Sequence, residues 1–148
     1  MKTIYFYTTT DEYGCFSNFS RHGFELDGKY WKTSEHYFQA QKFAGTPHEE
    51  NVRRAETPKK AASIGRKRDL PLRPDWEQIK DEIMFHAVLK KFQTHADIRE
   101  MLLNTGDAEL VENAPGDYYW GSGKDGSGQN KLGIILMQVR TQLRADNA

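Results

Sequence analysis

The pattern of polar and apolar residues is typical of strands at the start of the chain and of helices after about residue 31. Residues 3–8 are mainly β-branched and aromatic, which is typical of a strand. Residues 23–31 alternate around Asp27-Gly28, a dipeptide that favours the tight turn of a β-hairpin. After the hairpin the apolar residues recur at helical spacing. The pattern predicts an α+β domain, in which a small N-terminal β element is followed by about six helices.

The expected helix starts carry residues whose side chains bond the first free backbone N–H groups. These starts are Thr33 or Ser34, Thr46, Thr57, Asp75, Thr94 and Asn130. Proline follows Thr46 and Thr57, at the first helical position that it favours. Glycines suited to the residue after a helix stand at Gly45, Gly65 and Gly106.

The helix expected from residue 34 onward carries an unusual polar row. Glu35, Gln39 and Lys42 are spaced i, i+4, i+7 and share one side of the helix. Glu35 and Lys42 are roughly 10 Å apart along the axis, so they do not form the usual pair of neighbouring turns. Two interpretations stay open, a solvated polar face or the wall of a pocket. The pocket is favoured by the aromatic residues of this stretch, Trp31, Tyr37, Phe38 and Phe43.

Length and composition limit the class of protein. The chain has 148 residues, of which 37% are hydrophobic and 28% charged, and we expect one soluble domain over residues 1–148. No apolar run approaches the ~20 residues of a membrane span, so no membrane partner is expected. The single cysteine, Cys15, excludes an internal disulfide and favours a cytoplasmic location. A formal net charge of zero argues against general coating of nucleic acid.

Positive charge is concentrated between residues 53 and 73. The residues concerned are Arg53, Arg54, Lys59, Lys60, Arg66, Lys67, Arg68 and Arg73. Such a run is either a solvated face or a clamp for phosphate oxygens, which arginine forks and lysine ammonium groups match. Gly65 before Arg66 would let the backbone approach a ligand closely.

A glycine-rich loop precedes the last helix. Gly121, Gly123 and Gly126 have the spacing of a dinucleotide fingerprint, but no buried strand precedes them and too little chain follows for a Rossmann unit. Gly128 is followed by Gln129, so the loop is not a P-loop. It is either a plain loop or an anion site at a helix start. Trp120 beside it is either a stacking surface for a ring or a core residue.

The residues that commonly bind metals lack suitable spacing. The five histidines form no His-x-x-x-His or Cys-His pattern, so we expect no metal site. His36 is interpreted as a hydrogen-bonded, partly buried histidine rather than a general base. Cys15 beside Phe16 is interpreted as a small buried residue rather than a nucleophile.

Several of these motifs together resemble the NADAR, or YbiA-like, family. The resemblance begins at Phe16-Ser17-Asn18-Phe19 and is most specific over Asp27-Gly28-x-x-Trp31-x-Thr33-Ser34-Glu35-His36-Tyr37-Phe38-Gln39-Ala40-Gln41-Lys42-Phe43. It continues through Ala62-x-x-x-Gly65-Arg66, Pro71-Leu72-Arg73-x-x-Trp76, Tyr119-Trp120-Gly121 and Asn130-x-Leu132-Gly133. The resemblance covers nearly the whole chain.

The resemblance implies an N-glycosidase that needs neither metal nor cofactor. Family members are associated with hydrolysing ribosylamino-pyrimidine phosphates, which are riboflavin intermediates, and with removing ADP-ribose from guanine bases. The expected partner is therefore a small ribosyl-phosphate or ADP-ribosyl substrate, with ADP-ribosylated guanine of DNA or RNA as a further partner. Glu35 is the expected catalytic carboxylate and Lys42 the catalytic amine, with Asp117 as second choice for the carboxylate. The expected substrate-binding residues are Asn18, Phe19, Trp31, Ser34, Gln39, Arg66, Trp120, Gly121 and Asn130.

Two other classes of function remain open from the residues. A non-catalytic ADP-ribose or nucleotide reader would use the same basic run, glycine loop and Trp120, and would bind without forming product. A nucleic-acid-binding module is less favoured because of the zero net charge, and its binding to unmodified DNA would fall steeply with salt.

Overall fold

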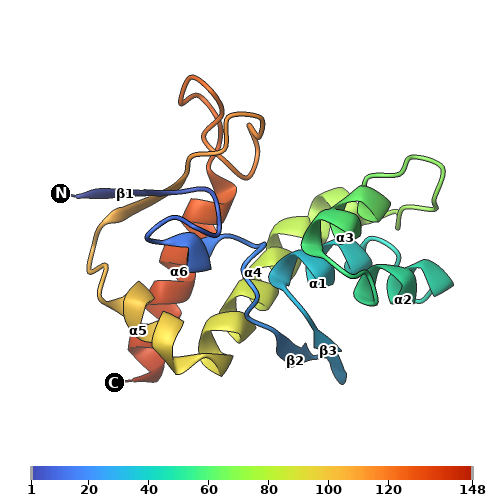
Figure 1. Ribbon diagram of the computed structural model, residues 1–148, viewed down its shortest axis with the longest axis horizontal. Helices are drawn as coiled ribbons and strands as arrows, with labels where there is room; N and C mark the ends of the chain where they lie inside the picture. Colours follow the sequence, from blue (N-terminus) through green and yellow to red (C-terminus); the bar gives the residue numbers. More distant parts are fainter. Residues whose placement is uncertain (1, 148) are drawn as a thin grey trace.

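The computed structural model describes residues 2–147 and confirms the α+β class. The described part contains six α-helices, four short strands and one 3₁₀ turn, η1 (Gly14–Phe16). The long helix α4 (Trp76–Thr94) crosses the middle of the molecule (Figure 1). On one side of it lie β1 (Thr3–Phe6), β4 (Glu109–Glu112), α5 (Ala96–Leu103) and α6 (Lys131–Asp146), and on the other side α1 (Ser34–Gln41), α2 (Pro47–Arg53) and α3 (Pro58–Gly65).

The predicted hairpin is confirmed. Strands β2 (Phe24–Leu26) and β3 (Lys29–Trp31) pair antiparallel, with Phe24 opposite Trp31. Asp27 and Gly28 form the turn with φ of 56° and 77°. Positive φ at both central residues is what a two-residue hairpin requires, and the Asp-Gly dipeptide tolerates it.

The sequence predicts β structure only near the N-terminus, but a fourth strand lies in the C-terminal third of the chain. Strand β1 pairs in parallel with β4, which comes more than a hundred residues later, with Thr3 opposite Glu109 and Phe6 opposite Glu112. Residues 109–112 were not predicted to form a strand, because this stretch is short and has no clear alternation of polar and apolar residues. Strand β4 places its last residue beside the glycine-rich loop, since the backbone N–H of Ser122 donates to the carbonyl of Glu112 at 2.8 Å.

The predicted helices are present, with small shifts at their ends. Thr33, Thr46 and Thr57 are the N-caps of α1, α2 and α3, and each side chain accepts a backbone N–H. Helix α1 ends at Gln41, and the turns that follow it lead to Gly45, which has φ of 84°. Asn130 precedes α6 without capping it, because its side chain bonds to β4 instead.

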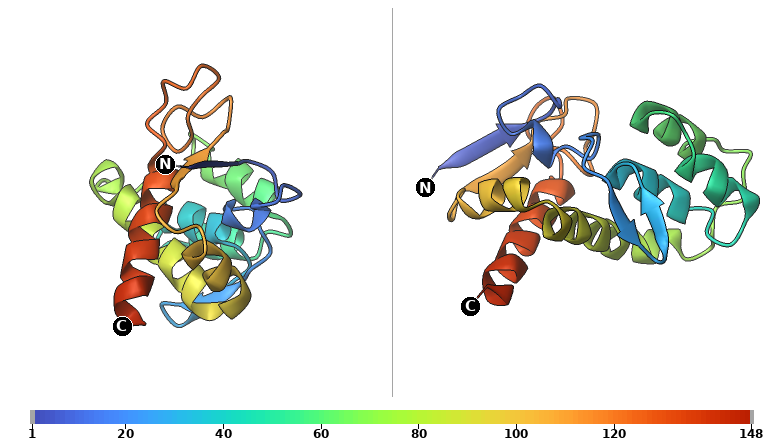
Figure 2. Two further views of the ribbon diagram at one scale, coloured as in Figure 1. Left: turned by 90° about the vertical axis from the view of Figure 1, so that its left-hand side faces the viewer. Right: turned by 60° about the horizontal axis from the view of Figure 1, so that its bottom comes forward.

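The core consists of two hydrophobic clusters that share α4. The larger cluster joins α4 to β1, β4, α5 and α6 around residues such as Phe16, Phe92 and Leu136. The smaller cluster packs the hairpin and the first three helices against Ala87 of α4, around Trp31. The two further views show α1 and the hairpin on one side of α4, apart from α6 (Figure 2). Helix α1 contacts α2, α3 and α4, so its side chains lie at the centre of this second layer.

No helix in the described residues 2–147 is long and apolar enough to cross a membrane.

Candidate active site

Helix α1 is buried along its whole length. Every residue from Ser34 to Gln41 is buried, and Glu35 and Gln39 are only 7% and 3% exposed. The interpretation of their row as a solvated face is therefore wrong. A short helix enclosed by α2, α3 and α4 places even its polar side inside the molecule. Burying a charged group costs free energy unless the group is paired. The contacts of Glu35 therefore determine whether its carboxyl can be ionised inside the molecule.

Glu35 combines burial with a small number of polar partners. Its Oε2 accepts a hydrogen bond of 2.7 Å from Nε2 of Gln39, and its backbone N–H donates to the carbonyl of Asn18. Burial raises the pKa of the Glu35 carboxyl. The Gln39 hydrogen bond and the positive charges of Arg66 and Lys42 oppose this shift. The pKa of Glu35 therefore depends on its burial, its hydrogen bond to Gln39 and the charged side chains near it.

Lys42 lies at the end of the same row, half-buried against aromatic rings. Its Nζ donates to the carbonyl of Gly65 at 3.1 Å and lies 5.9 Å and 5.8 Å from the ring centres of Phe38 and Trp76. Burial lowers the pKa of the Lys42 ammonium, whereas the charge of Glu35 raises it. An amine with a lowered pKa can serve as a cation or, once neutral, as a nucleophile.

Gly65 at the end of α3 allows this close packing. A Cβ atom built on Gly65 would lie 2.0 Å from Oε1 of Gln39, so α3 approaches α1 in a way that only glycine permits. Oε1 of Gln39 is buried and has no hydrogen-bond partner within residues 2–147. The amide therefore uses only its N–H₂ group, and it directs that group at Glu35.

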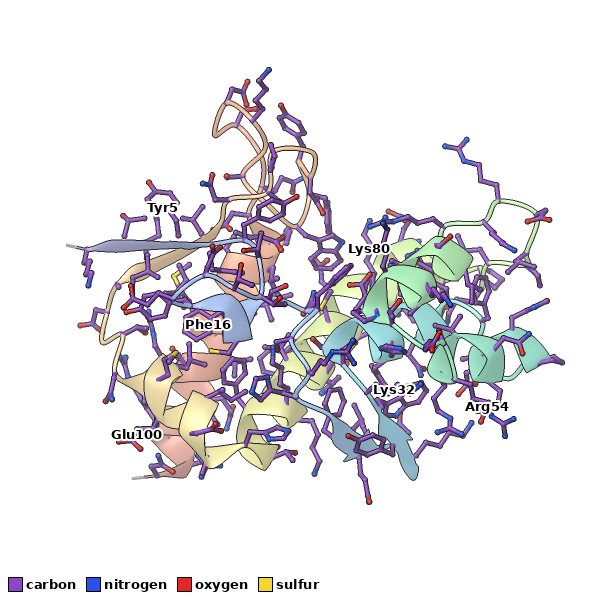
Figure 3. All side chains as sticks on the ribbon, in the orientation of Figure 1. Tyr5, Phe16, Lys32, Arg54, Lys80 and Glu100 are labelled. Carbon is purple, nitrogen blue, oxygen red and sulfur yellow. The ribbon has the colours of Figure 1, made fainter. Side chains whose placement is uncertain are left out.

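Aromatic rings form a connected wall beside Lys42. Phe38 packs on Trp76 at 5.0 Å and on Trp120 at 5.1 Å between ring centres, and Trp120 packs edge-on to Tyr119. Trp120 is partly exposed and can still offer a surface to a planar ring. Figure 3 labels Lys80, which lies on α4 near the glycine-rich loop, with its Nζ 4.1 Å from the centre of the Tyr119 ring.

Trp31 does not join this wall. It is 0% exposed, belongs to the smaller core cluster, and donates its indole N–H to the carbonyl of Leu26. A side chain with no accessible surface cannot touch a substrate in this conformation. The predicted binding role of Trp31 therefore has no support from its placement, and the aromatic crowding around residue 31 reflects the core.

Asn18 and Ser34 join the loop after η1 to the start of α1. The Ser34 hydroxyl donates to Oδ1 of Asn18 at 2.8 Å, and Nδ2 of Asn18 lies 3.4 Å from the sulfur of Met84. Both residues are buried, so they position the backbone beside Glu35 rather than face solvent. Phe19 is 36% exposed and lies at the edge of the same segment.

The glycine-rich loop is held by its own residues and by β4. Oδ1 of Asp117 accepts the backbone N–H groups of Tyr119 and Trp120. Gly121 is tightly packed, since a Cβ there would meet Ala114, Asp117 and Glu112 at 3.0 Å. The Asn130 side chain bonds the backbone of β4 on both sides of Val111. Gly121 and Asn130 thus shape the loop through backbone contacts.

The basic run divides in two. Arg53 and Arg54 pair with Glu50, Lys60 pairs with Glu56, and Arg73 pairs with Asp75. Arg66, Lys67 and Arg68 are exposed and form no ion pair within residues 2–147. Arg66 directly follows Gly65, whose carbonyl accepts a hydrogen bond from Lys42, and its positive charge acts to lower the pKa of both Glu35 and Lys42.

The remaining sequence candidates behave as ordinary structural residues. Both ring nitrogens of His36 have hydrogen-bond partners, Thr33 and the carbonyl of Ala55. Burial raises the pKa of the Cys15 thiol, which disfavours the thiolate needed by a nucleophile. Within residues 2–147 no group of three or more His, Cys, Asp or Glu side chains is arranged to hold a metal ion.

The structure adds two residues that sequence reasoning missed. Glu112 at the end of β4 lies beside the glycine-rich loop, where its carbonyl accepts the N–H of Ser122, and burial, with the negative charges of Asp117 and Glu35, raises the pKa of its carboxyl to about 8. Lys91 is 1% exposed and donates to the carbonyls of Cys15 and Ser17, which fixes the segment before Asn18. Nothing in the local sequence marks Glu112, because strand β4 itself was not predicted. Lys91 could have been noticed as a charge among the apolar positions of α4.

The fold is a small α+β domain in which a carboxyl, Glu35, lies on a buried helix and an amine, Lys42, directly follows that helix. The model of the NADAR domain matches residues 5–144, and the chain belongs to the NADAR family. The expected family and fold are thereby confirmed.

The chain is similar to curated proteins over nearly its full length. It is 53% identical to an N-glycosidase of Nostoc punctiforme, over 96% of this chain and 93% of that protein. It is 50% identical to the N-glycosidase YbiA of Escherichia coli K12, over 95% of this chain and 88% of the relative. The NMR structure of E. coli YbiA matches 99% of this chain and 87% of its own, with a TM-score of 0.92 and 48% sequence identity. These relatives confirm the predicted class, an N-glycosidase.

A more distant relative is named after riboflavin biosynthesis. The chain is 41% identical to a chloroplastic riboflavin biosynthesis protein, PYRR, of Zea mays, and the match covers 95% of this chain but 25% of the maize protein. The region of the maize protein that is similar to this chain is therefore one part of a longer protein.

Proposed function

We propose that this protein hydrolyses the N-glycosidic bond of a 5′-phosphorylated ribosylamino-pyrimidine, an intermediate of riboflavin synthesis. The observation that supports it most is a buried carboxyl, Glu35 of α1, on the same row as a half-buried amine, Lys42 at the C-cap of that helix, in a domain of the NADAR family. The name of the maize relative supports the choice of pathway.

The bond to be broken determines the roles of the two groups. Cleavage of C1′–N builds positive charge on the ribose and negative charge on the leaving nitrogen. The carboxylate of Glu35 stabilises the developing cation or accepts a proton from the attacking water. Lys42 acts either as a cation beside the ribose or as a nucleophile on the opened sugar aldehyde. Its contacts with Phe38, Trp76 and the Gly65 carbonyl are compatible with both roles.

Substrate binding is assigned to groups around this pair. We assign phosphate binding to Arg66, because it is exposed and forms no ion pair within residues 2–147. We assign stacking on the base to Trp120, whose ring is partly exposed and packs on Phe38, and a further contact with substrate to Phe19, which is 36% exposed. Asn18, Ser34 and Gln39 position Glu35 and its helix, while Gly121 and Asn130 hold the loop that carries Trp120.

A second candidate activity is removal of ADP-ribose from guanine bases. Arg66, Lys67 and Arg68 form a short exposed cationic segment with no ion pairs within the described residues. Such a segment suits a substrate with more than one phosphate, including ADP-ribosylated guanine of DNA or RNA. The catalytic groups would be the same.

The experiment compares the substrates directly. Purified protein is incubated with the ribosylamino-pyrimidine phosphate and, separately, with ADP-ribosylated guanosine, and the released sugar is followed by mass spectrometry. Turnover of the pyrimidine compound is the expected result. Turnover of ADP-ribosylated guanosine alone would move the assignment to the second activity. Binding of ADP-ribose without product from either compound would contradict both activities and support a reader module.

A further inference from the structure

Lys80 lies on the face of α4 that borders the proposed catalytic amine. It stands one helical turn after Trp76, so the two side chains are neighbours on this helix. The ring centre of Trp76 lies 5.8 Å from Nζ of Lys42 and 5.0 Å from the ring centre of Phe38. The side chain of Lys80 is only 17% exposed although it carries a charge. Lys80 therefore places a second ammonium group beside the aromatic residues of the site.

A series of ring contacts joins Lys80 to Lys42. Nζ of Lys80 lies 4.1 Å from the centre of the Tyr119 ring, within the range of a cation–π contact. Tyr119 packs edge-on to Trp120 at 4.8 Å, and Trp120 packs edge-on to Phe38 at 5.1 Å. Phe38 in turn lies 5.9 Å from Nζ of Lys42. The two ammonium groups thus stand at the two ends of one continuous wall of three aromatic rings.

Tyr119 is held against Lys80 by bonds to two parts of the chain. Its hydroxyl donates to the carboxylate of Asp81, the residue after Lys80 on α4. Its backbone N–H donates to Asp117, and its carbonyl accepts the N–H of Lys131 at the start of α6. The position of the ammonium relative to the wall is therefore fixed by α4 and the glycine-rich loop together.

The ammonium of Lys80 has donors left for a ligand. Its one ion pair within residues 2–147 is with Glu77 at 2.7 Å, and the Glu77 side chain is 71% exposed. An ammonium carries three N–H donors, whereas the Tyr119 ring offers only its π face to the charge. An ion pair with so exposed a partner contributes little to stability. The pair with Glu77 therefore does not account for a lysine placed against this wall.

The two sides of Lys42 carry different cations. On one side Lys42 donates to the carbonyl of Gly65, the residue before Arg66. On the other side lies the aromatic wall that leads to Lys80. Burial lowers the pKa of the Lys42 ammonium most, and the positive charges of Arg66 and Lys80 lower it further, which agrees with cations on both sides. Arg66 is assigned to the phosphate, and Lys80 lies on the side of Trp120, the ring assigned to the base.

We propose that Lys80 binds the leaving pyrimidine base and that its ammonium stabilises the negative charge that develops there. This inference rests on the proposed N-glycosidase reaction and assigns the group that acts on its leaving side. As the C1′–N bond breaks, its electron pair moves to nitrogen and is shared with the ring carbonyl, to which Lys80 donates a hydrogen bond. Water forms the new bond to C1′ and gives a proton to Glu35, which passes it to solvent. The leaving nitrogen takes a proton from solvent, and Lys80 keeps its own.

Kinetics on two leaving groups test the proposal. The ammonium acts on charge that develops in the transition state, so Lys80→Met should lower kcat on the ribosylamino-pyrimidine phosphate by about 10²–10³-fold with little change in KM. The loss should be clearly smaller on an analogue with a ring nitro group beside the leaving nitrogen, because the nitro group withdraws the developing charge. Lys80→Arg should keep part of the rate. Lys90→Met, a half-buried lysine of the same helix, is the matched control and should behave as wild type.

Two kinetic results would overturn the proposal. An equal loss of kcat on both leaving groups, in a variant that unfolds at the wild-type temperature, would make Lys80 structural. A rise in KM confined to the phosphorylated substrate, with kcat kept, would make Lys80 a phosphate-binding residue. Glu77→Gln removes the ion pair but keeps the ammonium, so it should retain most of the rate. The same loss in Glu77→Gln as in Lys80→Met would assign the effect to the ion pair instead.

A second measurement does not depend on activity. In nitrogen-15 NMR of the lysine ammonium groups, the signal that is missing in Lys80→Met should shift when the free aminopyrimidine is added and stay in place with inorganic phosphate. A signal that responds to phosphate alone, or to neither compound, would overturn the proposal even if the enzyme is active. Conversely, a shift with the aminopyrimidine in a protein that turns over neither substrate would contradict the proposed reaction and keep Lys80 as a base-binding residue.

Discussion

Gln39 donates a hydrogen bond from Nε2 to Oε2 of Glu35 at 2.7 Å, one helical turn away on α1. The other end of the same amide, Oε1, is buried against Gly65 and has no hydrogen-bond partner in the described part of the chain, residues 2–147. Because Oε1 would repel a carboxylate, only this orientation of the amide supports the ionised form of Glu35. The bond therefore holds the rotamer of the proposed catalytic carboxyl and favours its ionised form, against the burial that raises its pKa.

Glu35→Gln should lower turnover by about 10²–10⁴-fold while the fold and substrate binding stay nearly intact. Glutamine has the same shape but neither accepts a proton from water nor stabilises a cationic ribose. Turnover number and substrate affinity are measured separately, with thermal unfolding as the check on the fold. Glu25→Gln, a change of an exposed carboxyl on β2, should behave as wild type. Near-normal turnover of Glu35→Gln would remove Glu35 from the chemistry.

Gly65→Ala should reduce activity through Gln39. The new methyl group would lie 2.0 Å from Oε1 of Gln39, so the amide must move and its bond to Glu35 is lost. We expect a fall in kcat of at least roughly tenfold, because small displacements of catalytic groups are costly. Gly116→Ala is the control, since nothing lies within 4 Å of a Cβ at that position. Equal activity of the two variants would show that the Gln39 bond is not needed.

Helix starts and the hairpin could be predicted from the sequence, because they depend on the residues at each cap and turn. Thr33, Thr46 and Thr57 cap the helices that they were expected to cap, and Asp27-Gly28 makes the expected turn. Strand β4 was not predicted, because its pairing with β1 depends on contacts between distant parts of the chain. A four-residue strand carries too few residues for its alternation to be distinguished from chance.

Only part of the candidate site could be predicted from the sequence, because the rest depends on contacts between distant parts of the chain. The spacing of Glu35, Gln39 and Lys42 follows from helix geometry, and the structure places all three together with Arg66 acting on them. Burial depends on tertiary packing, so the sequence alone did not show that Trp31 lies in the core or that strand β4 withdraws Glu112 from solvent. A pattern of residue types does not distinguish an aromatic core from an aromatic wall.

Arg66→Ala should weaken binding of the phosphorylated substrate with a smaller effect on kcat. Arg66 is exposed at the edge of the site, where its guanidinium can bond phosphate oxygens. We expect KM to rise by about tenfold or more, as the loss of a charge-assisted hydrogen bond of ~1.5–3 kcal/mol implies. KM is measured for the phosphorylated substrate and its dephosphorylated analogue. Equal losses on both would make Arg66 structural, and Arg68→Ala tests whether any nearby charge suffices.

Lys91→Met should flatten the dependence of stability on pH. Burial lowers the pKa of Lys91 to about 7, whereas the unfolded chain keeps the ordinary value near 10.5. Between these values only the unfolded state binds the proton, so the stability contributed by neutral Lys91 falls as the pH drops from about 10.5 to about 7 and levels off below about 7, where both states are protonated. The slope is at most ~1.4 kcal/mol per pH unit. Urea unfolding at pH 7 and pH 9 measures it. Lys90→Met, the half-buried neighbour, should keep the wild-type difference, and an unchanged difference in Lys91→Met would contradict the prediction.

Lys42→Arg separates the two roles open to the amine. Nζ of Lys42 lies 3.1 Å from the Gly65 carbonyl, and burial lowers the pKa of its ammonium while Glu35 raises it. The nearby carboxylate favours the charged form, so we expect an electrostatic role. Arginine should then preserve much of the rate, and borohydride added during turnover should trap no adduct. A nucleophile would give the opposite pattern, with activity lost in Lys42→Arg and a reduced covalent sugar found on Lys42 by peptide mass spectrometry. An adduct mapped to Lys42 would therefore replace the electrostatic role by a covalent one.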